Sequence, residues 1–189
     1  MVAPGSAVSR RQLLGATGAA GLALALAGCG RAHPAAVHVA KLPPNLKAVD
    51  AAIFNALIDA EYVVAAAYIA GIPLLSDHNL RAAKHFLVHE ISHITQLSNL
   101  VNVAHGVPNG PRASYDLGHP RSQTQVLDVI HRAEQATIRA YLDAIPKLSP
   151  GAPRAAAASI LANEAQHVSV VRRNLGLDPV PDAVVTATE

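Results

Sequence analysis

The fold is decided by the stretch AEYVVAAAYIAGIPLL at residues 60–75, together with its counterpart AEQATIRAYLDAIPKL at 133–148. The Ala-Glu, Ala-Tyr and Ile-Pro pairs that they share all lie 73 positions apart. After one inserted residue the register continues in a second pattern, Glu90-x-x-His93 and Glu164-x-x-His167. The chain therefore contains two copies of one unit, and such repeats decide the architecture. Each unit is a helix with a lone Glu followed by a helix with Glu-x-x-His.

The composition favours packed helices and excludes several function classes. Hydrophobic residues make up 51% of the 189, with few aromatics at 3%, which suits a helical bundle better than a β-sandwich. The formal net charge is +2, and it falls to zero without Arg10 and Arg11. The sequence has no basic patch that would indicate a nucleic-acid partner. The single Cys29 excludes an intrachain disulfide and a cysteine metal cluster.

The N-terminus has the pattern of an export leader. Arg10 and Arg11 precede a short apolar run over 15–27, and the pair resembles a twin-arginine signal. The run ends in Leu-Ala-Gly-Cys29, which resembles a lipobox. The resemblance implies a signal peptide over 1–28, a lipid on Cys29 and a tether over 29–46. We therefore expect an exported protein anchored to the outer face of the cell membrane. The alternative is an ordinary signal peptide with a chance cysteine.

Hydrophobic periodicity and stop signals predict an all-α four-helix bundle over 47–178, followed by a tail over 179–189. A loop rich in Pro, Gly and Asn separates the second helix from the third. Short loops within each pair and one long crossover between pairs define the expected topology. The expected helices cover 48–70, 76–105, 122–145 and 153–175, and Ser76 is the expected N-cap of the second.

Each repeated Glu interrupts an apolar stripe at mid-helix. Around Glu61, for example, the stripe contains Leu57, Ile58, Val64 and Ala65 at helical spacing. Four of the five Glu in the chain hold such positions, and the fifth is the C-terminal residue. Glu is rarely buried without a partner, and no matching Lys or Arg lies in these stripes. Two divalent cations would balance four carboxylates, whereas solvated surface charges are the poorer interpretation.

The sequence resembles the ferritin-like superfamily, specifically exported bacterial ferritin-like proteins. The resemblance covers about 48–185 and includes the closing VPDAVVT at 180–186. It implies two Fe ions, or alternatively Mn, with Glu90 and Glu164 as bridging ligands. The implied ligands are Glu61, Glu90, His93, Glu134, Glu164 and His167.

The activity implied by the resemblance is metal-dependent oxidation with oxygen or peroxide as the small-molecule partner. Members of the superfamily include ferroxidases, peroxidases, oxygenases, catalases and domains without known activity. The alternative is a non-catalytic surface lipoprotein that binds metal or a partner protein. A homodimer is a further expectation.

Other residues near the expected ligands have competing interpretations. His89, Glu90 and His93 also fit the zinc-protease motif H-E-x-x-H, but the second copy has Asn163 in place of the first His. We expect His89 at the boundary or surface, with a position beside the metal site as the alternative. For His85 and His131 we expect ordinary polar contacts. Tyr68 and Tyr141 lie two turns beyond Glu61 and Glu134. They either form hydrogen bonds or relay single electrons beside a metal site, or they pack in the core with the hydroxyl satisfied.

Overall fold

The computed structural model describes residues 46–187, and the leader, Cys29 and most of the tether lie outside this range. Within it the chain is helical and contains no strand, as predicted. The elements are α2 (Ala48–Gly71), the 3₁₀ turn η1 (Ile72–Leu74), α3 (Asp77–Val103), α4 (Gln123–Ala144), the 3₁₀ turn η2 (Ile145–Lys147) and α5 (Ala152–Asn174). Each α-helix begins and ends within two residues of the expected position.

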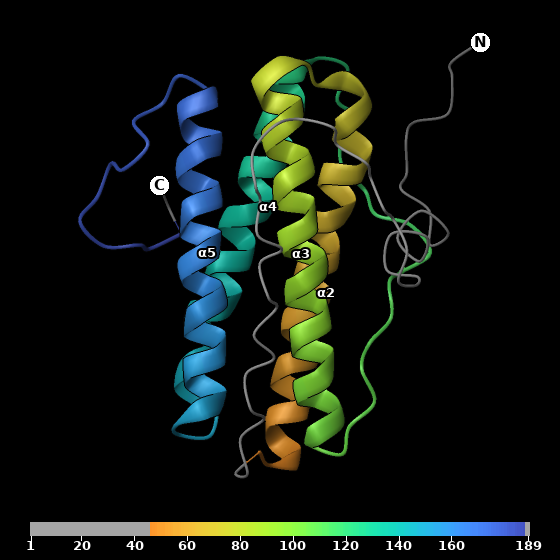
Figure 1. Cartoon of the computed structure of the whole chain (residues 1–189), viewed down its shortest axis with the longest axis vertical. Helices are drawn as coiled ribbons and strands as arrows, with labels where there is room; N and C mark the ends of the chain where they lie inside the picture. Colours follow the sequence, from red (N-terminus) through yellow and green to blue (C-terminus); the bar gives the residue numbers. More distant parts are fainter. Residues whose placement is uncertain (1–45, 188–189) are drawn as a thin grey trace, which may run out of the picture.

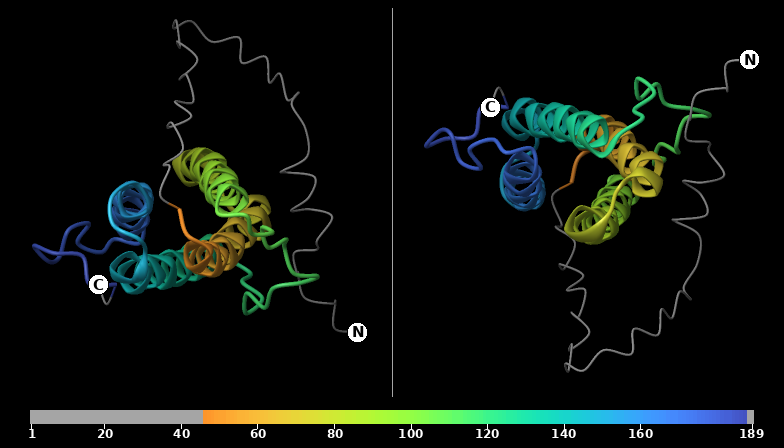
Figure 2. Two further views of the ribbon diagram at one scale, coloured as in Figure 1. Left: turned by 90° about the horizontal axis from the view of Figure 1, so that it is seen from below. Right: turned by 90° about the horizontal axis from the view of Figure 1, so that it is seen from above.

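The helices run side by side along one long axis (Figure 1). Seen along that axis, α2 and α4 are neighbours, α3 packs on α2, and α5 packs on α4 (Figure 2). The pair α3 and α5 completes the bundle but has little direct packing. One repeat unit, α2 with α3, thus faces the other, α4 with α5. The Glu of α2 and α4 and the Glu-x-x-His of α3 and α5 are brought to the same level.

Local signals explain the helix ends. Pro73 and Pro146 follow the last turns of α2 and α4 inside η1 and η2, where a missing N–H costs nothing. Ser122 caps α4, and its Oγ accepts a hydrogen bond from the Gln125 N–H at 3.3 Å. Ser76 holds the N-cap position of α3 as predicted, but its side chain makes no capping hydrogen bond. Its backbone N–H instead donates to Gln123 Oε1 at 2.9 Å, which ties the start of α3 to α4.

The most apolar helix is α2, because it has a neighbour on two sides. Its stretch Ala48–Leu74 has a mean hydropathy of 1.5 over 18 residues and is long enough to cross a membrane. In the structure it packs between α3 and α4 (Figure 2), and Phe54, Ile58 and Val64 are fully buried. The apolar character of α2 therefore follows from its place in the core.

The crossover after α3 runs back along the outside of the bundle to the start of α4 (Figure 1). It is fixed to α2 by polar contacts. The Asn55 side chain donates to Val107 O at 2.9 Å and accepts from the Asn109 N–H at 2.7 Å. Tyr115 and Leu117 of the crossover are buried. These contacts hold a segment without helix or strand in one path, so that α4 starts at the same end of the bundle as α3.

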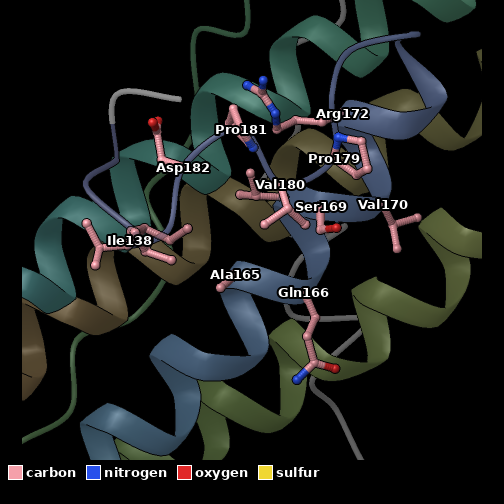
Figure 3. A pocket seen from close by; sticks show the side chains of 13 residues that line it. Ile138, Ala165, Gln166, Ser169, Val170, Arg172, Pro179, Val180, Pro181 and Asp182 are labelled. Carbon is pink, nitrogen blue, oxygen red and sulfur yellow. The ribbon is translucent and has the colours of Figure 1, made fainter.

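The C-terminal tail loops away from α5 and returns to the bundle. Ala187 is buried against Ile138 and Val168, and Arg139 donates a hydrogen bond to its carbonyl oxygen. Between the tail and α5 lies a mainly apolar cavity of about 550 Å³ with Val180 and Arg172 among its lining residues (Figure 3). None of the expected metal ligands lines this cavity.

Candidate metal centre

Six acidic and imidazole side chains from all four helices meet in the middle of the bundle. The four carboxylates and His167 have no solvent exposure, and His93 is 7% exposed. They are the residues expected from the sequence: Glu61 on α2, Glu90 and His93 on α3, Glu134 on α4, and Glu164 and His167 on α5.

The cluster divides into two overlapping groups that could each hold one metal ion. The first contains Glu61, Glu90, His93 and Glu164, and the second contains Glu90, Glu134, Glu164 and His167. In each group one ligand atom per residue lies within 4.8 Å of all the others. Glu90 and Glu164 belong to both groups, so they occupy the positions that bridging carboxylates would take.

Each imidazole lies closest to the carboxylate of the other repeat. His93 Nδ1 is 2.8 Å from Glu164 Oε1, and His167 Nδ1 is 2.9 Å from Glu90 Oε1. The distances to the Glu on the same helix are longer, at 3.8 Å for His93 and 3.7 Å for His167. The two halves therefore form one site with an approximate twofold arrangement.

The two tyrosines also reach across the repeat. Tyr68 donates its hydroxyl hydrogen to Glu134 Oε1 at 2.5 Å, and Tyr141 donates to Glu61 Oε1 at 2.5 Å. Both rings are buried. The structure shows both core packing of the rings and hydrogen bonds from the hydroxyls to two members of the cluster. Each hydroxyl bonds the Glu of the other helix and not the Glu on its own helix face. The sequence did not predict this pairing, because it shows only that Tyr68 and Glu61 share a face.

The remaining ligand atoms of the cluster have no hydrogen-bond donor. Ten buried side-chain polar atoms in the described range have no hydrogen-bond partner, and eight of them belong to these six residues. His93 Nδ1 and Glu164 Oε1 are close but are not aligned as donor and acceptor. Buried polar atoms are normally satisfied, and several acceptors converging without a donor are satisfied by a cation. The donor set of carboxylates and imidazoles suits Fe or Mn, so the residues fit a pair of such ions.

The pKa directions of the cluster residues indicate how the cluster balances its charge when no cation is bound. Burial raises the pKa of Glu90 and Glu164 well above the usual value, and the carboxylate of Glu134 adds to the effect. Burial lowers the pKa of His93, but the adjacent carboxylates of Glu164, Glu61 and Glu90 outweigh burial and raise the pKa to about 12. Four carboxylates in one dry site cannot all stay ionised unless positive charge neutralises them.

For His89 the sequence favoured a boundary or surface position over one beside the site. It is half-buried at the boundary, and its Nδ1 also contacts the cluster, 2.9 Å from His167 Nε2. Burial, and then the nearby His167, lowers its pKa to about 4, so the ring is neutral. The signal that could have found it is its spacing of four from His93. His85 is exposed, and His131 is half-buried with its Nε2 unpartnered.

Comparison with known proteins agrees with this geometry. A family model for the ferritin-like domain matches residues 49–177, more than half of the chain. The chain belongs to the ferritin-like family. A search of curated proteins finds no match.

A solved ferritin-like structure resembles this chain in fold. It is the crystal structure of ferritin-like, diiron-carboxylate proteins from Bacillus anthracis strain Ames, with a TM-score of 0.59 and 16% sequence identity. The alignment covers 67% of this chain and 95% of the other. At this identity the likeness concerns the fold, and the residues of this ferritin-like chain must carry the argument for its site.

Proposed function

We propose that this ferritin-like protein binds two Fe or Mn ions and uses them for oxidation with oxygen or peroxide. The observation that carries the proposal is the convergence of four carboxylates and two imidazoles with eight unpartnered atoms in the core. In this proposal Glu61, Glu90, His93 and Glu164 hold one ion, and Glu90, Glu134, Glu164 and His167 hold the other. The diiron-carboxylate description of the solved relative supports the same assignment.

When bound, such a metal pair would supply two electrons to reduce oxygen or peroxide. The chain itself provides the surroundings. Phe86 stacks on the His167 ring at 4.2 Å between centroids and keeps water from that side of the imidazole. Tyr68 and Tyr141 each fix one carboxylate oxygen through a hydroxyl hydrogen. Such outer hydrogen bonds orient metal ligands. The overall reaction would oxidise two Fe(II) ions and convert one peroxide and two protons to two waters.

Turnover separates this function from that of a non-catalytic metal- or partner-binding lipoprotein. Full-length protein loaded anaerobically with Fe(II) is mixed with peroxide or oxygen, and Fe(III) formation is followed by absorbance. The proposal predicts oxidation much faster than that of free Fe(II). Protein that holds iron but oxidises it no faster than buffer would instead support the binding role.

We further propose export and anchoring at the outer face of the cell membrane, supported by the leader pattern and by Cys29. The twin-arginine route carries folded proteins, so metal could be loaded before competing external ions are met. Cys29→Ser is expected to release the protein from the membrane fraction, and replacing Arg10 and Arg11 with Lys is expected to block export. Undiminished export of folded protein from the double-Lys variant would contradict the twin-arginine assignment.

A further inference from the structure

Three histidines form a line along α3 at intervals of four residues. His85, His89 and His93 are one helical turn apart, and residues at this spacing are neighbours on a helix. Their burial increases along the line. His85 is exposed, His89 is half-buried and His93 is 7% exposed inside the cluster. The line thus leads from solvent to the metal ligands.

The imidazoles are in contact from one end of the line to the cluster. The rings of His85 and His89 lie 4.3 Å apart between centroids. His89 Nδ1 then lies 2.9 Å from His167 Nε2 on α5. The proposed ligand His93 follows one turn further along α3. His89 therefore touches both the exposed imidazole and the buried site.

The repeat does not require this arrangement. At the positions of His85 and His89, the second copy has Ser159 and Asn163, although it supplies an equivalent set of proposed ligands. The two outer histidines are additions to one half of a nearly twofold site. His89 faces α5 through its contact with His167, and α3 and α5 have little direct packing. His93 is the most exposed member of the cluster.

We propose that His85 and His89 form an entry site that captures a divalent metal ion from solvent and passes it to the buried cluster. This inference rests on the proposed function, because it supplies the route to that centre. Two His four residues apart on a helix can bind one metal ion from the same face, and imidazole suits Fe, Zn, Ni and Cu.

The test is the rate at which metal-free, full-length protein takes up Co(II), followed by stopped-flow absorbance under anaerobic conditions. His85→Ser copies the residue of the other repeat at an exposed position, so the fold should be unaffected. His78→Ser is the matched control, because His78 is another exposed histidine on α3. Removing one half of a chelating pair is expected to slow uptake about tenfold or more, while the final Co(II) content stays that of the wild type. His78→Ser should leave the rate unchanged.

The outcomes separate the two proposals. If wild-type protein takes up no Co(II) into a coordinated site, both the proposed function and the entry site are wrong. If wild-type protein fills its centre and His85→Ser fills it at the same rate, only the entry site is overturned. A rate that falls equally in His85→Ser and His78→Ser would also overturn it, since that result indicates a general effect of surface histidines on α3.

Discussion

At the scale of single residues, the shortest contacts of the histidines and the hydrogen bonds of the tyrosines join one half of the repeat to the other. Each imidazole lies nearest the Glu of the other half's Glu-x-x-His pattern, and each tyrosine donates a hydrogen bond to the other half's lone Glu. A carboxylate that is held by a donor from another helix cannot turn without breaking that hydrogen bond. The hydrogen bonds therefore connect ligand orientation to the packing of α2 against α4.

Removing one tyrosine hydroxyl should weaken one metal position. Tyr141→Phe leaves Glu61 Oε1 without its donor, and loss of such an outer contact is expected to reduce metal affinity about 10- to 100-fold. Tyr68→Phe should act equally through Glu134. Titration with Co(II) or Mn(II) measures both. Tyr62→Phe keeps both hydroxyls and serves as the control, and an equal loss in that variant would argue against the tyrosine assignment.

Residue-level prediction from the sequence was good for the members of the buried cluster and poor for their surroundings. The cluster could be predicted because a Glu in an apolar stripe is conspicuous within one helix. The contact of His89 with His167, and the donation from Tyr68 to Glu134, join different helices. Such contacts depend on how far each helix is rotated against its neighbour, and periodicity along one helix does not contain that information.

At the scale of elements, the two repeats pack closely where α2 ends beside α4. A Cβ on Gly71 would lie 2.4 Å from Val126 Cγ1, and Val126 is buried. The backbone of Gly71 is in the ordinary helical region, so the requirement for glycine is space and not conformation.

Gly71→Ala is therefore expected to destabilise the fold by about 1–3 kcal/mol through overpacking. Chemical denaturation measures the change in the free energy of unfolding. Adding Val126→Ala should remove the clash, so the double variant should lose less than the sum of the two single losses. Strict additivity would show that the two side chains do not compete for space.

The start of α2 is joined to the η2–α5 connection by Asp50. Its carboxylate accepts the Lys47 N–H at 2.9 Å and the Ser149 N–H at 2.8 Å. Burial raises the pKa of Asp50, but the two backbone donors outweigh burial, and the pKa lies below the usual 3.8. Because the folded-state pKa is depressed, its stabilisation is present above pH 3.8 and is lost as the pH falls through the folded-state value.

Asp50→Asn is expected to cost about 1–3 kcal/mol at neutral pH, because one acceptor oxygen becomes a donor facing an N–H. The difference from the wild type should shrink as the pH falls below 3.8. Unfolding curves across this pH range measure it, with the exposed Asp143→Asn as the control. A difference that is independent of pH would show that the charge of Asp50 contributes nothing.

At the scale of the whole molecule, the bundle contains a charged centre that metal-free protein must neutralise with protons. Metal binding should therefore stabilise the native state. With free metal at 100 times its dissociation constant, the expected gain is about 2.7 kcal/mol. Glu90→Gln, which changes a residue of both groups, should show little gain. An equal gain in that variant would place the binding site elsewhere.

The architecture was predictable as a whole because length, stop signals and the repeat all pointed to the same bundle. The Pro-rich connection could be identified as a crossover, but its path could not, since it depends on contacts such as Asn55 with Asn109. The return of the tail to Ile138 was likewise beyond sequence reasoning. Export and lipidation concern residues outside the described range and stay predictions.

The central claim is that the buried cluster neutralises its charge by holding two metal ions. Its most direct test is the metal content of full-length protein after anaerobic loading with Fe(II) or Mn(II) and removal of free metal. We predict two ions per chain in the wild type, one each in Glu61→Gln and Glu134→Gln, which change a single group, and fewer than one in Glu90→Gln. Fewer than one ion per wild-type chain, or two ions retained in Glu61→Gln, would contradict the account.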